Sequence, residues 1–541
     1  MRLYLLALLC VMGGEVALIY ANPSFPMQID DVWMFFNILD SSFIYAGFSP
    51  QYGRFVPFAF WDLNILMTLF PFSDIKSAAK VYFAFNAVCF VLLFAVVFAC
   101  VKTLANSKIA LLSCVIIFVN LGFVIIITGI CYPEKCQSVF LGAFILSAFY
   151  VFYKQSDSNL MIAICALSAF MSLFYKETDF IFIGGFGGAY IVLYILYGYL
   201  KTHKLRLESF KNRNLCLYFI AIAMLFLVLY AIIILPDITT SYTATHSQRG
   251  KLILRDIFNC IVNHPFLFIF LPSLMLVRLR EIVASCKRRE FGALELRFIF
   301  FDALALCVVA CILGYFSLRL FSAYYFFPHY ILGFLPAVFY ALRYGAKWLF
   351  IAVFALYLMV NVPLALSTYT TTKILPPHYL KAVSFMADLS HTKPTNIFLL
   401  GQNRDADGLM YYDFMKRFLL YFGAENFDLK TMKANPPNFT ATPSAYTIFN
   451  SHIVSVPQKG DLLYLDSNCK DFVTKAYLAD LEEKYELVFA STYSGFYNLN
   501  AKSLVKYLLQ DSTIYGKYVK IDRISSNIFR APLGVYVYRV K

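Results

Sequence analysis

The sequence predicts a polytopic α-helical membrane protein with about eleven transmembrane helices, followed by a soluble α/β domain. Of its 541 residues, 60% are hydrophobic and only 14% are charged, and the mean hydropathy is +0.67. Apolar stretches that approach the roughly 20 residues needed to cross a bilayer recur through residues 1–366. No soluble domain of this size needs so much apolar surface. We therefore expect residues 1–366 to form a membrane domain and residues 367–541 to form a separate soluble domain.

Eleven stretches are long and apolar enough to be predicted as membrane spans. Residues 56–71 are also apolar, but they are short and contain Asp62 and Asn64, so we expect them to lie at the membrane interface. Residues 1–20 could be a signal peptide, but Glu15 interrupts their apolar run, which favours an uncleaved first helix. The predicted spans are residues 3–21, 78–101, 109–130, 137–153, 159–175, 180–200, 215–235, 263–279, 298–317, 323–342 and 347–366.

The basic loops give these spans an orientation. If the N-terminus is cytoplasmic and residues 56–71 do not cross, the densest basic loops, at 201–213 and 278–297, lie in the cytoplasm, as the positive-inside rule requires. If residues 56–71 crossed the membrane, both loops would move outside. The net charge of +14 thus indicates cytoplasmic loops and anionic headgroups rather than nucleic acid. The predicted outer segments are residues 22–77, 131–136, 176–179, 236–262, 318–322 and the chain from about 367.

Residues 367–541 have a different pattern from the spans. Short strand-like runs alternate with helical patterns, which is typical of an α/β domain, and the topology places this domain on the outer face. The predicted strands are residues 396–401, 461–465 and 534–540, and the predicted helices are residues 409–422, 477–485 and 503–510.

The thirteen cysteines do not show the repeated short spacing of a zinc site. Many lie inside apolar runs, where cysteine behaves as a small core residue. Cys131 and Cys136 differ, because they bracket a short loop on the predicted outer face. We expect free thiols there, with a disulfide between the two as the alternative.

Charged residues are scarce in this chain, and several of them fall in loops predicted to share the outer face. Ionisable groups beside a membrane are costly unless they face water, a partner or a substrate. Cations among them could hold a phosphate leaving group, and a carboxylate could take a proton from an acceptor. In chain order these residues are Asp30, Asp31 and Arg54 in the first loop, Glu134 in the second, Lys176 and Glu177 in the third, and Arg319 in a fourth, with His329 a few turns into the next helix.

The motifs in these loops resemble those of the GT-C glycosyltransferases, polytopic enzymes that take a sugar from a polyprenyl-phosphate carrier and that include protein O-mannosyltransferases and lipid A aminoarabinose transferases. The first loop has an Asp-Asp pair in IDDVWMFFN and a Tyr-Gly-Arg element in QYGRFVPF. The second has Pro-Glu in YPEK, and the third has Lys-Glu in YKETD. An arginine, aromatic residues and a proline, RLFSAYYFFPHY, open a late helix. The resemblance covers residues 1–366.

The resemblance implies a role for each of these polar residues. Asp30 would be the base that deprotonates the acceptor, with Asp31 as its close alternate. Some relatives bind a divalent metal near these acids and others do not, and two adjacent acids do not decide between them, because a hard cation takes more oxygen ligands. Arg54, Lys176 and Arg319 would contact the donor phosphate, and Glu134, Glu177 and His329 would orient these cations or the acceptor.

The resemblance also implies partners and a location. The donor would be a polyprenyl-phosphate-linked sugar, the acceptor a lipid, a glycan or a protein, and the location a bacterial inner membrane. A transporter or flippase of lipid-linked substrates is one alternative, but the spans hold few charges and no internal repeat is visible. An oligosaccharide polymerase or ligase is another, but such enzymes usually rely on a large late loop, whereas the largest polar region here is terminal.

Each candidate residue also has a purely structural interpretation. These interpretations are helix capping for Asp30 and Asp31, headgroup anchoring for Arg54, an ordinary loop position for Glu134, an exposed helix-end pair for Lys176 and Glu177, and core packing for His329.

Overall fold

The chain forms two compact units in a computed structural model. The first, here called the helical unit, comprises Met1–Ala21 and Asn37–Ala365, and the second, the mixed unit, comprises Asn22–Phe36 and Leu366–Lys541. Residues Asn22–Phe36, predicted as part of the membrane domain's first outer loop, thus group with the mixed unit. The structure describes residues 2–24, 29–40, 42–44, 47–50, 53–70, 72, 74–202, 210–238, 253–288, 295–318, 320–400, 405–432, 457–466, 475–496 and 533–541.

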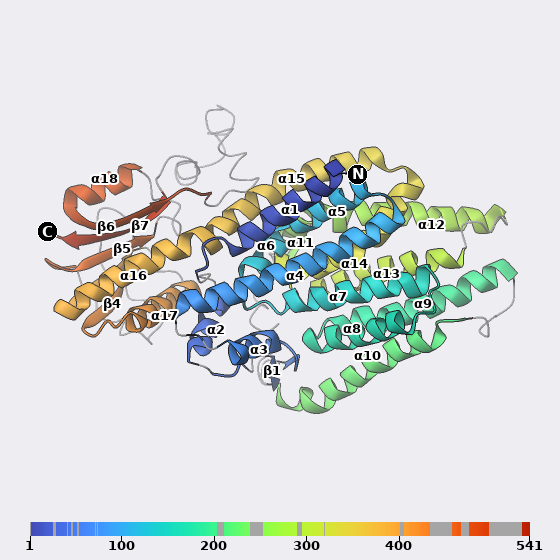
Figure 1. Cartoon of the computed structure of the whole chain (residues 1–541), viewed down its shortest axis with the longest axis horizontal. Helices are drawn as coiled ribbons and strands as arrows, with labels where there is room; N and C mark the ends of the chain where they lie inside the picture. The colour runs from blue at the N-terminus through green and yellow to red at the C-terminus, as the bar shows by residue number, and fades with distance from the viewer. Residues whose placement is uncertain are drawn as a thin grey trace. The chain divides into compact units, whose positions relative to one another are not determined.

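The helical unit consists almost entirely of helices, with one short β-ribbon between β1 and β2 (Figure 1). Some of its helices begin where a side chain satisfies free backbone amides: Asp74 caps α4 and Asn106 caps α5. The elements are α1 (Arg2–Tyr20), β1 (Phe48–Ser49), β2 (Arg54–Phe55), α3 (Trp61–Leu69), α4 (Ile75–Leu104), α5 (Ser107–Phe118), α6 (Leu121–Thr128), α7 (Glu134–Ala148), η2 (Phe149–Tyr153), α8 (Asn159–Tyr175), α9 (Asp179–Thr202), α10 (Arg213–Ile233), η3 (Leu235–Asp237), α11 (Ile253–Asn263), η5 (Phe266–Phe270), α12 (Leu271–Arg288), η7 (Leu296–Phe298), α13 (Ile299–Ser317), α14 (Ala323–Tyr344) and α15 (Lys347–Tyr369), the last of which continues into the mixed unit.

Among the described residues, seven helices are long and apolar enough to cross a bilayer, or up to nine if two bent pairs each count as one span. Two shorter apolar helices, Leu9–Tyr20 and Asn159–Tyr175, fall on two further predicted spans. The helix α3 has only nine residues, which is about 14 Å of helix, so it cannot cross a hydrocarbon core of roughly 30 Å. The chain is therefore an integral membrane protein, and residues 56–71 do not form a spanning helix.

Two of the candidate spans are sharply broken, which the sequence does not predict. The bend between α5 and α6 is 67°, and the bend between α11 and η5–α12 is 100°. Asn361 of α15 bonds to the backbone at both breaks: its Nδ2 donates to the Asn263 carbonyl at 2.8 Å, and its Oδ1 accepts from the Leu121 amide at 3.2 Å. Inside a membrane such freed backbone groups must find partners in the protein. One buried asparagine provides them for two interruptions.

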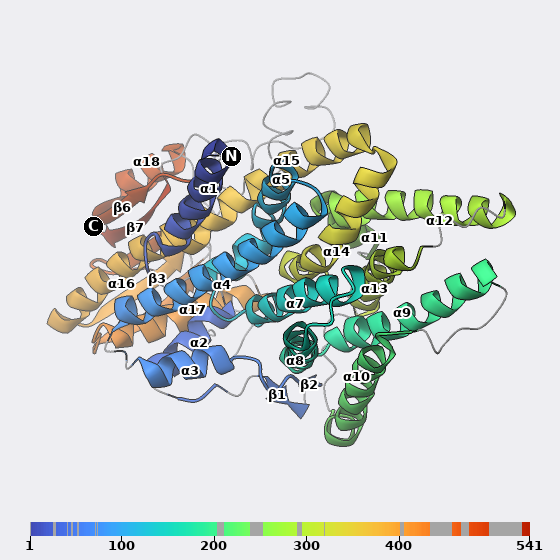
Figure 2. The same cartoon turned by 45° about the vertical axis from the view of Figure 1, so that its right-hand side comes forward.

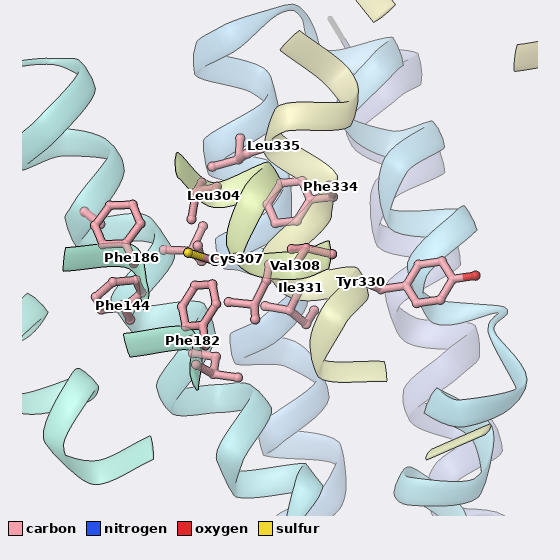
Figure 3. Close-up of a cluster of buried hydrophobic side chains, with 14 of the residues drawn as sticks. Phe144, Phe182, Phe186, Leu304, Cys307, Val308, Tyr330, Ile331, Phe334 and Leu335 are labelled. Atoms are coloured by element: carbon pink, nitrogen blue, oxygen red, sulfur yellow. The ribbon is translucent and has the colours of Figure 1, made fainter. Parts of the chain in front are cut away.

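The core of the helical unit is aromatic where α7, α9, α13 and α14 meet (Figure 3). Phe144 of α7 meets Phe182 and Phe186 of α9 edge-on, with ring centroids 5.7 and 5.6 Å apart. The neighbouring α4 and α8 pack against α7 (Figure 2). A Cβ on Gly187 would lie 2.6 Å from the carbonyl oxygen of Cys216, so glycine permits the close approach of α9 and α10.

A buried polar network ties four helices together near the C-terminal ends of α9 and α14. Asp302 of α13 accepts hydrogen bonds from Nε and Nη2 of Arg278 in α12, at 3.0 and 2.9 Å. It also accepts from the hydroxyls of Tyr197 in α9 and Tyr340 in α14. Arg278 donates a further bond, of 2.8 Å, to Glu281. This network satisfies a buried carboxylate and a buried guanidinium at once.

The mixed unit is built on a five-stranded sheet of order β4-β3-β5-β7-β6. The strand β3 is parallel to β4 and β5, whereas β7 is antiparallel to β5 and β6. Three of its strands, β3, β5 and β7, overlap the three predicted strands. The elements are α2 (Ile29–Leu39), η8 (Thr370–Ile374), α16 (Leu375–Thr392), β3 (Thr395–Leu400), α17 (Asp405–Tyr421), β4 (Phe427–Met432), β5 (Leu462–Asp466), α18 (Lys475–Lys484), β6 (Tyr485–Tyr493) and β7 (Leu533–Val540).

Helices cover both faces of this sheet. Side chains alternate along a strand, so Leu463 and Leu465 of β5 face a cluster that includes Leu481 of α18. Tyr464, between them, faces the other side and meets Tyr379 of α16, with ring centroids 6.1 Å apart. The mixed unit therefore has its own three-layered core.

Replacing Asp302 by asparagine should destabilise the helical unit, because Arg278 would lose its main counter-charge inside the protein. Removing one partner of a buried pair costs about 3–5 kcal/mol, so we expect a lower unfolding temperature for the purified protein in detergent. The exposed pair of Lys211 and Asp157 is the control: the Asp157 side chain is 82% exposed, and Asp157→Asn should cost at most about 1 kcal/mol. Equal losses in the two variants would contradict the assignment.

Candidate functional site

Lys176 and Glu134 form a buried ion pair between two helix ends. Lys176 directly follows α8, and Glu134 is the first residue of α7. Lys176 Nζ lies 2.8 Å from Glu134 Oε1, and the two side chains are only 4% and 1% exposed. The ammonium group also lies 5.0 Å from the ring centroid of Tyr325, within the range of a cation–π interaction. The interpretations of Lys176 as part of an exposed pair and of Glu134 as an ordinary loop residue are therefore wrong.

Two further charged residues act on Lys176. Burial lowers the pKa of its amine, but the carboxylates of Glu134 and Glu177 outweigh this, Tyr325 adds to their effect, and Arg54 opposes it. The net pKa of Lys176 is raised above its usual range, so the side chain stays protonated at physiological pH. Arg54 is half-buried in β2, and its charge is close enough to be felt by the ion pair. Four charges from three loops therefore act on one another.

A second buried cluster contacts the chain neighbours of both partners in this ion pair. Asp62 of α3 accepts a hydrogen bond of 2.9 Å from the Tyr175 hydroxyl, and its Oδ2 lies 3.4 Å from Lys135 Nζ. Tyr175 precedes Lys176 in the chain and Lys135 follows Glu134, so Asp62 contacts one neighbour of each partner in the ion pair. The sequence marked Asp62 only as an interruption of an apolar run. Since a carboxylate in a nine-residue apolar helix needs a partner, that interruption was the signal for this contact.

The start of α9 adds further polar contacts beside the ion pair. Gln137 Nε2 donates to Asp179 Oδ1 at 2.6 Å, and the hydroxyls of Thr178 and Tyr315 lie 2.6 Å apart. All four residues are buried. These bonds join α7, α9 and α13 and fix the loop that carries Lys176 and Glu177. Neither Gln137 nor Tyr315 was singled out from the sequence.

His329 lies in the same region but is packed within its helix. It is buried, its Nδ1 is 3.1 Å from the carbonyl oxygen of Tyr325 one turn earlier, and its ring centroid is 5.0 Å from that of Tyr315. These contacts match the core-packing interpretation. A role for His329 in orienting the substrate stays a prediction.

The two glutamates of the site keep buried hydrogen-bond acceptors. Among the described residues, none donates a hydrogen bond to either carboxylate oxygen of Glu134 or to Oε2 of Glu177, although all three atoms are buried. Lys176 approaches Glu134 closely but off the hydrogen-bonding direction. Buried acceptors of this kind normally have a donor, which a hydroxyl-bearing ligand or water would supply. The cluster can therefore offer cations to an anion and acceptors to hydroxyl groups.

The two acids predicted as catalytic lie in α2. This helix begins at Ile29, so Asp30 and Asp31 belong to its first turn and do not precede it as an N-cap. Carboxylates in a first turn interact favourably with the helix dipole. Asp31 is buried and belongs to the mixed unit, and the side chain of Asp30 lies outside the described residues. Their convergence with the Lys176–Glu134 pair stays a prediction, as does the role of Arg319, which also lies outside the described residues.

The structure excludes a disulfide between Cys131 and Cys136, and its described residues contain no cluster of metal-ligating side chains. Cys131 and Cys136 are free thiols, as expected, and both are buried. Among the described side chains, no group of three or more His, Cys, Asp or Glu is placed to hold a metal ion. A metal at Asp30 and Asp31 is untested, because the Asp30 side chain is not described.

Comparisons with known proteins return only remote structural likenesses. No family model and no curated protein matches the chain. Among solved structures, the Archaeoglobus fulgidus oligosaccharyltransferase in complex with Zn and sulfate shares 12% identity at a TM-score of 0.40, over 98% of this chain and 88% of that one. ArnT from Cupriavidus metallidurans in the apo state shares 10% identity at a TM-score of 0.39, over 90% of this chain and 95% of that one. Both are GT-C glycosyltransferases, the superfamily that the loop motifs resemble. At these TM-scores the likeness does not establish the fold or the function of this chain.

Replacing Glu134 by glutamine should make the stability of the protein rise with pH between about 7 and 10. In the wild type the pKa of Lys176 is raised, so its contribution is complete below the unfolded lysine pKa of about 10.4 and is lost only as the pH rises through the folded pKa. Without Glu134, burial lowers the pKa of Lys176 with only Glu177 and Tyr325 to oppose it. The unfolded state then binds more protons, so stability increases with pH.

Thermal unfolding of the purified proteins in detergent across this pH range would measure the effect. Asp237→Asn, which removes an exposed carboxylate in η3, is the matched control and should follow the wild-type profile. A Glu134→Gln profile parallel to that of the wild type would show that the ion pair does not set the ionisation of Lys176.

Proposed function

We propose that this chain is a glycosyltransferase that moves a sugar from a polyprenyl-phosphate-linked donor to an acceptor at the outer face of the membrane. The observation that supports it best is the buried Lys176–Glu134 pair, with Glu177 beside it and Arg54 acting on it. The carboxylate oxygens of Glu134 and Glu177 that lack a donor among the described residues add acceptors next to these charges. Such a mixed-charge cluster suits a substrate that carries both a phosphate and hydroxyl groups.

In the proposed reaction the cations stabilise the leaving phosphate. The bond between the sugar and the phosphate oxygen breaks, negative charge grows on that oxygen, and Lys176, Arg54 and Arg319 would neutralise it. Asp30, with Asp31 as its alternate, would take the proton from the attacking acceptor hydroxyl or amine. Glu134 and Glu177 would hold the cations in place and accept hydrogen bonds from the sugar. We assign the donor to the polyprenyl-phosphate class because the site lies at the ends of membrane-spanning helices.

The acceptor would be a lipid, a glycan or a protein, and the mixed unit would contribute to binding it. The proposed topology has a cytoplasmic N-terminus, with the mixed unit and the Lys176 loop outside, in a bacterial inner membrane. The helical unit has polar groups at two ends: the Lys176–Glu134 pair lies at one end and the network of Arg278 and Asp302 at the other. Basic residues lie near the Arg278–Asp302 end, as expected for a cytoplasmic face.

A transporter or flippase of lipid-linked substrates is the second candidate, and the two bent helix pairs favour it. Broken helices near the midplane commonly build transport sites. At both breaks, however, Asn361 already hydrogen-bonds the backbone. The charged cluster lies at helix ends and not at the breaks. Transfer of labelled sugar by purified protein, without a membrane to cross, would separate the two functions. An oligosaccharide polymerase or ligase would instead use a glycan on both donor and acceptor carriers.

Asp30→Asn should abolish sugar transfer while leaving expression and membrane insertion intact, because the amide cannot accept the acceptor's proton. The measurement is transfer from radiolabelled polyprenyl-phosphate sugars by purified protein. Asp40→Asn is a matched control, since Asp40 is an exposed acid directly after α2, and it should keep wild-type activity. Transfer by Asp30→Asn at the wild-type rate would remove Asp30 from the mechanism.

Cysteines introduced at positions 40 and 211 should react from opposite sides of the membrane. Asp40→Cys should react with a membrane-impermeant maleimide on intact cells, and Lys211→Cys only after the membrane is opened. The background would lack Cys10 and Cys286, the two described cysteines that are not buried, and Cys469, which lies outside the described residues. Labelling of both positions from the same side would overturn the topology, whatever the chemistry of the site.

A further inference from the structure

The helical unit contains an apolar crevice far from the candidate site. It has a volume of about 390 Å³, within the range of about 300–1,000 Å³ that is usual for small-molecule sites. It lies between α5, the η5–α12 segment, α14 and the start of α15. Its walls are almost wholly hydrophobic and include Ile116, Phe270, Tyr330, Phe334 and Phe350.

Small residues on α14 leave this space open. Gly333, Ala337 and Ala341 all line the crevice and follow one another at intervals of four, so they share one face of the helix, and Gly345, directly after α14, lines it too. Two of the helical segments that border the crevice, α5 and η5–α12, also end or begin at a sharp bend, of 67° and 100°. Helix packing in membranes usually fills such a face with another helix, but here a crevice remains.

A lysine stands at one end of the crevice. Lys347, the first residue of α15, lines it and is exposed. Among the described residues no carboxylate forms an ion pair with Lys347, whereas Arg343, near the end of α14, pairs with Glu281. The adjacent Trp348 is 79% exposed, and tryptophan prefers the headgroup level of a membrane. The crevice thus runs from an apolar interior to the exposed ammonium group of Lys347, which lies 5.8 Å from the ring centroid of Trp348 and has no carboxylate partner among the described residues.

This crevice is separate from the cluster around Lys176. Tyr325, which contacts Lys176, and Tyr330, which lines the crevice, are five residues apart, so they point about 140° apart around α14. In Figure 3, Tyr330 points away from the core cluster of Phe144, Phe182 and Phe186. Lys347 follows the C-terminal end of α14, whereas Tyr325 is near its start. The two sites are therefore at opposite ends and on different faces of this helix.

We propose that the crevice binds an acyl chain of an anionic phospholipid, with the headgroup phosphate at Lys347. An apolar chain matches the walls, and a phosphate supplies the missing counter-charge. This site is independent of the proposed transferase function.

The test uses the purified full-length chain, reconstituted in vesicles that contain a phosphatidylglycerol with a photoactivatable group near the end of one acyl chain. After illumination, mass spectrometry should find the label concentrated in peptides of α5 and α14 that line the crevice. The same probe with a phosphatidylcholine headgroup should label them several-fold less. Label spread evenly around the lipid-facing helices, or equal labelling by both headgroups, would overturn the proposal.

Two variants and their controls sharpen the result. Ala337→Phe fills the crevice and should reduce its labelling several-fold, whereas Leu313→Phe, at a 61% exposed position of α13 outside it, should not. Lys347→Gln should abolish the headgroup preference, whereas Lys102→Gln, which removes an exposed lysine near the end of α4, should keep it. If excess unlabelled polyprenyl phosphate displaces the phosphatidylglycerol label from the wild type, the crevice belongs to the donor and the proposal is wrong.

Discussion

A buried lysine stays protonated only where carboxylates close to it supply the counter-charge. Lys176 is such a residue at the end of α8, and Glu134, the first residue of α7, is its direct partner. Taking each charge out of water costs several kcal/mol, which the partner must offset through close and well-fixed geometry. The second cluster of Asp62, Lys135 and Tyr175 supplies that geometry, because it fixes the residues next to both partners.

The same requirement shapes the backbone of the helical unit. Each break in a helix frees amide and carbonyl groups that lipid cannot satisfy, and two breaks are stabilised together through Asn361. At the other end of the unit, Asp302 gathers Arg278 and two tyrosines from three helices. Polar side chains thus act as fixed links between helices whose remaining contacts are apolar and weakly directional. Between these links the packing can leave a crevice, as it does along α14.

The sequence predicted the helices well, because a run of apolar residues is sufficient to specify a spanning helix. Among the described residues, seven helices are long and apolar enough to span a membrane, or up to nine with the two bent pairs, so the predicted number of about eleven stays a prediction. The two bends were not predicted, because residues such as Asn120 and His264 do not interrupt hydropathy enough to mark a break. Which polar residues contact one another was harder to predict from the sequence. Lys176 and Glu134 were both selected, but their direct contact joins positions 42 residues apart and follows from how α7 and α8 pack. Asp62 was treated as a flaw in an apolar run, because its partners belong to other loops.

The charge balance of the site limits how a donor could bind. Arg54, Lys176, Glu134 and Glu177 would carry two positive and two negative charges if all were ionised, so these four residues alone leave no excess of positive charge, and the carboxyl group of Asp179 also acts on Lys176. A phosphodiester would add one negative charge to a poorly solvated region and would compete with Glu134 for the ammonium group of Lys176. Under the proposed function Arg319 is the predicted source of a further cation. Because an ammonium group has three donors, Lys176 could contact a phosphate oxygen while Glu134 stays beside it. The carboxylate oxygens of Glu134 and Glu177 that lack a donor among the described residues would then be available to the sugar hydroxyls. Recognition of the phosphate and recognition of the sugar would in this way depend on the same few side chains.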